Sequence, residues 1–88
     1  MIRKFETIDE EILTILAEEC AELIQEIMKM KRKDHYRSET FEAEVGDVLA
    51  LLQLAQDEGL YDPDVALRFA ALKKEKLKKW SNIFENRA

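Results

Sequence analysis

Five acidic residues form two groups at the spacing of an α-helix. The first group is Glu18, Glu19 and Glu22, and the second is Glu44 and Asp47. Residues three apart lie on one face of a helix, so each group directs carboxylates the same way. Carboxylate oxygens are the ligands that a hard cation such as Mg²⁺ prefers in proteins. If the two helices pack together, these residues predict a divalent metal site between them.

The second group is the more informative, because Glu44 and Asp47 fall on the apolar face of their predicted helix. Burying an unpaired carboxylate is costly, so this pair needs a cation, a functional cavity or a buried ion pair with Lys or Arg. The first group taken alone is explained as well by an acidic stripe in contact with solvent. The apolar residues that share the face with Glu44 and Asp47 are Phe41, Val48, Leu51, Leu52, Leu54 and Ala55.

Lysines interrupt the apolar stripe of the last predicted helix. At about 100° per residue, Lys76 falls in the middle of the stripe, Lys73 and Lys79 flank it, and Lys74 and Lys78 point the other way. A single lysine in such a place commonly extends along the surface with its ammonium group in water. Three converging ammonium groups beside a metal site suit a polyphosphate. The apolar members of the stripe are Val65, Phe69, Leu72, Trp80 and Ile83.

Helix-capping residues divide the chain into three predicted helices. Ser, Thr or Asp commonly precedes the first turn of a helix, and Pro is favoured at the first helical position. These signals predict helices from Thr7 to Met30 or Lys33, from Ser38 or Thr40 to near Gly59, and from Asp62 to near Trp80, with a frayed or short helical tail from Ser81. The chain has only two Gly and one Pro and no internal repeat. We therefore expect one all-α domain over residues 1–88.

Chain length predicts self-association. A domain of 88 residues buries a limited fraction of its surface and is marginally stable alone. Three helices are also too few to enclose both a metal site and a nucleotide base. We therefore expect a helical bundle that is completed by a homodimer, with a tetramer as the larger alternative.

Charge and cysteine content restrict the classes of protein. The net charge of −5 argues against nonspecific binding to nucleic acid, which needs a positively charged face. No apolar run is long enough to span a bilayer, and no signal-peptide-like start is present. The single Cys20 rules out a disulfide within the chain and favours a reducing compartment. We expect a cytoplasmic protein that binds neither membrane nor nucleic acid.

The acidic groups resemble the motifs of the MazG-like all-α nucleoside triphosphate pyrophosphohydrolases. The family pattern is E-E-x-x-E, followed after a connection of variable length by E-x-x-D. Here the halves are Glu18-Glu19-x-x-Glu22 and Glu44-x-x-Asp47. Each half alone is common in helices, and the specificity comes from finding both on successive helices. The likeness covers most of the chain, including the helix that bears the lysines.

This resemblance implies Mg²⁺-dependent hydrolysis of a nucleoside or deoxynucleoside triphosphate to the monophosphate and pyrophosphate, with Mn²⁺ as a substitute cation. It implies metal ligation by Glu19, Glu22, Glu44 and Asp47, assistance at the metal or its water by Glu18, and phosphate contacts from Lys73, Lys76 and Lys79. The chain departs from many relatives in its third helix. They carry Asn after the helix-three lysine, then Arg and an aromatic residue, whereas Leu77, Lys79 and Trp80 follow Lys76 here.

Three other functions are alternatives to this one. A phosphoribosyl-ATP pyrophosphohydrolase has a related helical core and similar acidic motifs. A non-enzymatic helical dimerisation module would leave the acidic residues solvated or paired. A di-iron carboxylate protein needs Glu-x-x-His pairs, and the one histidine, His35, lies in a connection without Glu three residues before it.

Overall fold

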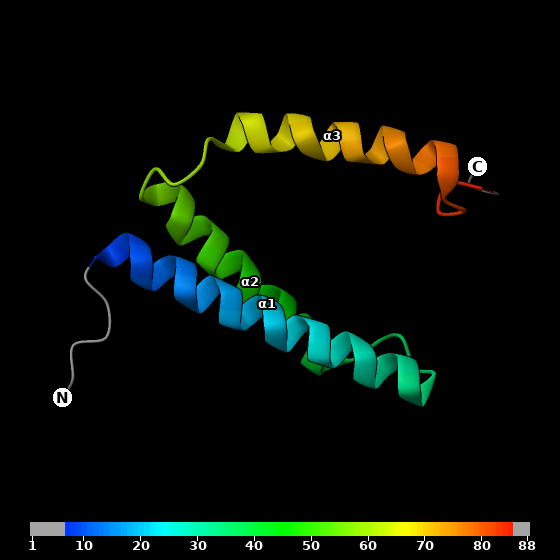
Figure 1. Ribbon diagram of the computed structural model, residues 1–88. Helices are drawn as coiled ribbons and strands as arrows, with labels where there is room; N and C mark the ends of the chain where they lie inside the picture. The colour runs from blue at the N-terminus through cyan, green and yellow to red at the C-terminus, as the bar shows by residue number, and fades with distance from the viewer. Residues whose placement is uncertain (1–6, 86–88) are drawn as a thin grey trace.

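The computed structural model describes residues 7–85 and contains three α-helices in that part of the chain. Helix α1 spans Ile8–Lys33, α2 spans Glu39–Asp57 and α3 spans Pro63–Trp80 (Figure 1). No strand occurs within residues 7–85. The all-α fold class expected from the sequence is therefore confirmed.

Each helix begins at a residue that the sequence marks as a cap. The Thr7 hydroxyl oxygen accepts a hydrogen bond from the Glu10 N–H at 3.0 Å, and the Ser38 hydroxyl oxygen accepts one from the Phe41 N–H at 2.9 Å. The side chain of Asp62 accepts hydrogen bonds from two N–H groups in the first turn of α3, which starts with Pro63. These bonds satisfy N–H groups that have no partner within their own helix.

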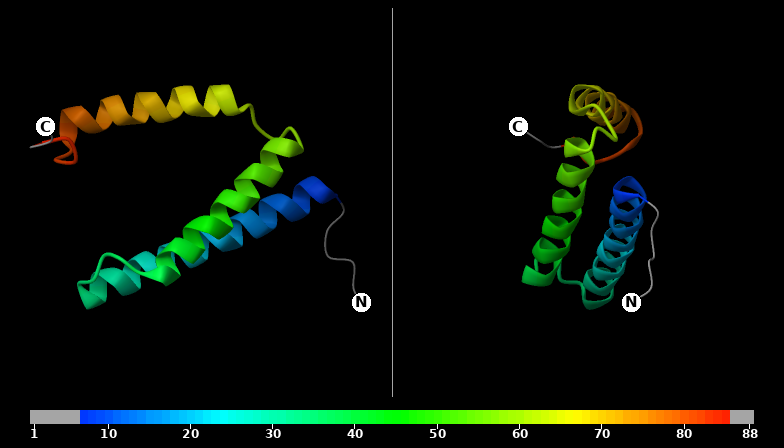
Figure 2. Two further views of the ribbon diagram at one scale, coloured as in Figure 1. Left: turned by 180° about the vertical axis from the view of Figure 1, so that it is seen from behind. Right: turned by 90° about the vertical axis from the view of Figure 1, so that its left-hand side faces the viewer.

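Helices α1 and α2 form an antiparallel hairpin and are the one pair among the described helices that packs extensively (Figure 2). The buried apolar residues of this hairpin are Ile12, Met30 and Ala55. Glu26 is also buried, with 8% of its surface exposed. The small core means that much of the apolar surface of residues 7–85 is not covered by other residues in that range.

The connection from α2 to α3 is hydrogen-bonded along its length. Gly59 adopts a left-handed conformation (φ 73°), its N–H bonds to the Gln56 carbonyl, and the Leu60 N–H bonds to the Ala55 carbonyl. This is the Schellman arrangement, in which a residue without a Cβ ends the helix. The Tyr61 hydroxyl then donates to the Leu52 carbonyl at 3.0 Å. The connection therefore sets the direction in which α3 leaves the hairpin.

Helix α3 runs apart from the hairpin (Figures 1 and 2). It has no buried residue, and Phe69, Leu72 and Trp80 are 67%, 55% and 65% exposed. The sequence predicts these three residues on an apolar stripe, but no residue within 7–85 buries them. Beyond Ser81, residues 83–85 form a turn, and the remainder of the expected tail, 86–88, lies outside the described residues. Among the described helices, none combines the length and apolarity needed to cross a membrane.

Candidate metal centre

Four carboxylates from two helices meet in the hairpin. Glu19 and Glu22 of α1 and Glu44 and Asp47 of α2 each offer one oxygen, and these oxygens all lie within 4.8 Å of one another. The antiparallel packing of α1 and α2 brings the two i, i+3 pairs to the same level. The structure thus joins the two acidic groups that the sequence places on separate helices.

The four side chains differ in exposure. Glu19 and Glu44 are half-buried, whereas Glu22 and Asp47 are exposed. The first two lie where the helices touch and the other two turn toward solvent. An ion held by the half-buried pair would leave the exposed side of the group open to a ligand.

Two of the carboxylate oxygens are buried without a hydrogen-bond partner. They are Oε2 of Glu19 and Oε2 of Glu44. No Lys or Arg within residues 7–85 forms an ion pair with any of the four acids, and the ion pair found there joins Lys78 to Glu75 at 3.0 Å. The alternative of a buried ion pair between these acids and Lys or Arg is therefore not realised among the described residues. A divalent cation would satisfy both oxygens.

Burial raises the pKa of Glu19, and the negative charges of Glu22, Asp47 and Glu44 raise it further. Burial likewise raises the pKa of Glu44, with added effects from Glu22, Asp47 and Glu26. In both cases removal from water is the largest cause and repulsion between carboxylates is the next. When no cation is bound, burial and mutual repulsion therefore destabilise the ionised form of these carboxylates. The donor set of four carboxylates suits a hard divalent ion such as Mg²⁺.

The other residues expected at the site lie elsewhere. Glu18 precedes Glu19 on α1, is exposed, and does not belong to the group of four. Lys73, Lys76 and Lys79 are exposed on α3. The ammonium group of Lys73 lies 5.2 Å from the centre of the Trp80 ring. A single chain does not bring these lysines to the carboxylates, because α3 does not pack against the hairpin.

Sequence reasoning missed the buried carboxylate of Glu26 on α1. Its Oε2 accepts a hydrogen bond from the Ser38 hydroxyl at 3.3 Å. Glu26 lies one turn beyond Glu22 and contributes to the raised pKa of Glu44. The four-residue spacing from Glu22 was a signal that it extends the same acidic face toward α2.

An antiparallel helix pair with an E-x-x-E and an E-x-x-D motif facing each other defines an all-α protein with a carboxylate site suited to a divalent cation. The family model described as MazG nucleotide pyrophosphohydrolase domain matches residues 8–79, so the chain belongs to that family. This confirms the resemblance drawn from the motifs. A search of curated proteins and a search of solved structures each gave no match.

Proposed function

We propose that this protein is a Mg²⁺-dependent hydrolase that converts a nucleoside or deoxynucleoside triphosphate to the monophosphate and pyrophosphate. Membership of a nucleotide pyrophosphohydrolase family gives the general class. The observation that carries the proposal is the meeting of four carboxylates, two of them with a buried and unpartnered oxygen. A helical adaptor gains nothing from such an arrangement, since it raises the free energy of the folded state.

In this proposal Glu19, Glu22, Glu44 and Asp47 hold Mg²⁺, for which Mn²⁺ substitutes. When bound, a divalent cation supplies Lewis-acid activation of phosphate and of water. The half-buried Glu19 and Glu44 fix the depth of the site at the helix boundary. The exposed Glu22 and Asp47 leave it open on the side from which a triphosphate enters.

Glu18 is the proposed general base for the attacking water. It is exposed and outside the group of four, so its carboxylate is not required to hold the cation. A carboxylate next to the site accepts the proton that water loses as it attacks the α-phosphorus. Water thereby forms the new P–O bond, and the bond to the pyrophosphate oxygen breaks.

Lys73, Lys76 and Lys79 are proposed to neutralise the pyrophosphate as it leaves. Pyrophosphate gains negative charge in the transition state, and ammonium groups held nearby stabilise that charge. The four acids have no cationic partner within residues 7–85, so these lysines are the natural source of positive charge.

We also propose that the active protein is a homodimer, or a tetramer built from it. In support, the apolar side chains of α3 and several of the hairpin are exposed, among them Ile24 at 61% and Leu49 at 59%. A soluble monomer seldom exposes this much apolar surface on one small domain. Association of copies would bury it.

Pyrophosphate release from a panel of nucleotides in the presence of Mg²⁺ tests the reaction. The panel includes the common nucleoside and deoxynucleoside triphosphates and phosphoribosyl-ATP, so that preference for the last compound identifies the related histidine-pathway activity. Calorimetric titration with Mg²⁺ alone tests the site without turnover. A protein that binds no Mg²⁺ and hydrolyses no member of the panel is a non-enzymatic module instead.

A further inference from the structure

Glu26 is a buried carboxylate with little compensation for its charge. It is the one charged residue that is buried within residues 7–85, with 8% of its surface exposed. The one hydrogen bond that it accepts from the described residues comes from the Ser38 hydroxyl at 3.3 Å, which is long for a bond between two oxygens. Lys29 and Lys33 line the same cavity, but neither forms an ion pair with it. A buried charge with one weak partner raises the free energy of the folded state.

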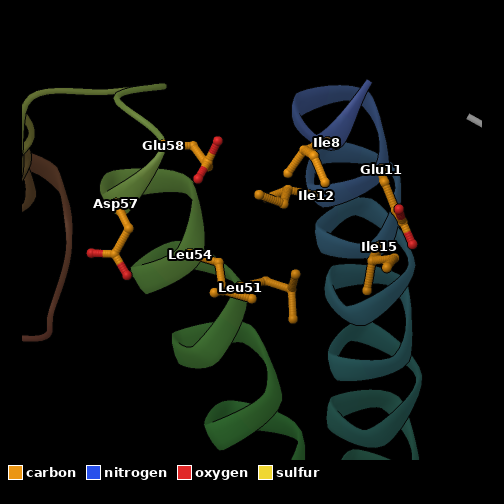
Figure 3. A pocket seen from close by; sticks show the side chains of 8 residues that line it. All are labelled: Ile8, Glu11, Ile12, Ile15, Leu51, Leu54, Asp57 and Glu58. Atoms are coloured by element: carbon orange, nitrogen blue, oxygen red, sulfur yellow. The ribbon is translucent and has the colours of Figure 1, made fainter. Parts of the chain in front are cut away.

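The packing of α1 against α2 does not by itself force a carboxylate into the interface. At the other end of the hairpin, Ile12 and Leu51 lie between the helices, whereas Glu11 and Asp57 lie on the outer sides (Figure 3). Both of these acids are exposed. An apolar or amide side chain in place of Glu26 would serve the packing without burying a charge. The charge of Glu26 therefore needs an explanation other than packing.

Glu26 lies beside the group of four carboxylates, on the side nearest the connection between α1 and α2. It follows Glu22 by four residues, which is about 6 Å along α1 and on the same face. Its partner Ser38 precedes Glu44 by six residues, which is about 9 Å along α2. The negative charge of Glu26 reaches Glu44 and raises its pKa. Glu26 thus adds a further negative charge behind the group of four.

A fixed charge in this place attracts any cation that the group of four holds. The attraction between a buried charge and a nearby cation is stronger than in water and is screened less by salt. Residues that support a metal site without ligating the ion commonly change its affinity for the metal. The cation in turn offsets the buried charge of Glu26, which the single bond from Ser38 does not.

We propose that Glu26 is a supporting carboxylate of the metal centre, which raises the affinity of the group of four for a divalent cation without ligating it. The hydrogen bond from Ser38 fixes the carboxylate in this place. The inference rests on the proposed function only in that the group of four holds a cation. It does not depend on which reaction the protein catalyses.

Calorimetric titration of Mg²⁺ into protein freed of metal by a chelator measures the effect of this charge without any substrate. Glu26→Gln keeps the size of the side chain and an oxygen that accepts from Ser38, but it removes the charge. The dissociation constant for Mg²⁺ should rise about 10-fold or more, the scale for residues that support a metal site. Glu42→Gln is the matched control, because Glu42 is an exposed acid on α2. It loses the same net charge and should bind Mg²⁺ as the wild type does.

Glu26→Met separates the charge from the hydrogen bond. Methionine is similar in size and lacks both the charge and the carboxylate acceptor, and the Ser38 hydroxyl keeps Sδ of Met30 as a partner at 3.8 Å. If the charge acts, the Gln and Met variants bind Mg²⁺ equally weakly. If the hydrogen bond acts instead, the Gln variant binds as tightly as the wild type and the Met variant does not. That result overturns the proposal, and so does wild-type affinity in both variants.

The stability of the metal-free protein gives a second readout. Glu26→Gln removes a charge that repels Glu44, so in a chelating buffer it should raise the free energy of unfolding measured with urea. Stability and Mg²⁺ affinity then change in opposite directions. A residue that only held the helices together would lower both when replaced. A fall in both quantities in Glu26→Gln therefore overturns the proposal.

Failure of this inference is distinct from failure of the proposed function. If the wild-type protein binds Mg²⁺ and releases pyrophosphate while Glu26→Gln binds Mg²⁺ equally well, the proposed function stands and the role of Glu26 is refuted. If the wild-type protein binds no Mg²⁺, the metal centre is refuted and the role of Glu26 with it.

Discussion

The Ser38 hydroxyl links the two helices that carry the metal centre. It donates to Oε2 of Glu26 in α1 at 3.3 Å and accepts from the Phe41 N–H in the first turn of α2 at 2.9 Å. Glu26 is buried and lies one turn beyond Glu22 on α1. The start of α2 is thereby tied to the helix that supplies Glu19 and Glu22.

Replacing Ser38 with Ala should lower the free energy of unfolding by about 1–2 kcal/mol, because α2 loses its cap and the buried Glu26 loses its donor. Urea denaturation followed by far-UV circular dichroism measures the change. Ser38→Thr keeps the hydroxyl and should lose much less. An alanine variant as stable as the wild type would show that the link contributes nothing.

Magnesium should stabilise the folded protein through the four carboxylates. At a free Mg²⁺ concentration of 100 times Kd, binding to the folded state alone adds about 2.7 kcal/mol. In Glu44→Gln the metal-free protein should be more stable than the wild type, since one of the clustered negative charges is gone, and the response to Mg²⁺ should be lost. Thermal denaturation with and without Mg²⁺ measures both effects.

The matched control for this substitution is Glu42→Gln. Glu42 is an exposed acid on the same helix and is outside the group of four. Its variant should respond to Mg²⁺ as the wild type does. An equal loss of response in both variants would mean that Mg²⁺ acts through general charge screening.

The stability of the metal-free protein should fall as pH rises above the ordinary pKa of a glutamate side chain, 4.5. Folding raises the pKa of Glu19 and Glu44, so between the ordinary and the raised values the folded state binds more protons than the unfolded state. Stability from these two groups is then present at low pH and lost as pH rises through the raised values. Urea denaturation at a series of pH values in this range, in a buffer with a chelator, measures the free energy of unfolding. In Glu44→Gln this free energy should change less with pH than in the wild type.

The three helices were predictable from local capping residues. The contact between the two acidic groups was predictable from the cost of burying carboxylates on an apolar face. Thr7, Ser38 and Asp62 cap their helices through bonds to the next few residues, which the sequence alone specifies. Glu44 and Asp47 on an apolar face predicted that the second acidic group faces another helix. Both inferences need only helical periodicity and the cost of burying charge.

The position of α3 and the burial of Glu26 were not predictable in the same way. A helical wheel shows that Phe69 and Leu72 share a face of α3, but it does not show which surface that face contacts. The contact depends on the direction of α3, which is set by the turn at Gly59 and the hydrogen bond of Tyr61. Glu26 shares the acidic sector of α1 with exposed residues. Its burial follows from the donor that Ser38 supplies at the end of the connection, a contact between residues twelve apart.

Loss of one ligand from each helix should abolish turnover without unfolding the protein. Glu22→Gln and Asp47→Asn each remove a negative charge from an exposed side chain of the cluster. Neither substitution therefore creates a cavity or a buried polar group without a hydrogen-bond partner. Pyrophosphate release is expected to fall on the order of 10²-fold or more, the scale seen when a group that stabilises the transition state is removed. Circular dichroism should be unchanged, and Glu42→Gln again serves as control. Retained activity in both variants would refute the ligand assignment.

The lysines of α3 provide a comparison within one helix. Lys76 lies on the apolar stripe and Lys74 points away from it, yet both are exposed and neither forms a salt bridge within residues 7–85. If Lys76 neutralises the departing pyrophosphate, Lys76→Ala should lower kcat by about 10-fold or more, because that charge develops in the transition state. Lys74→Ala removes the same net charge and should leave kcat near the wild-type value. Steady-state assays at two ionic strengths distinguish direct contact from a general charge effect. Equal losses of kcat in both variants that disappear at high salt would reflect the overall electrostatic field of the protein. A loss of kcat confined to Lys76→Ala and retained at high salt requires contact of this ammonium group with the substrate.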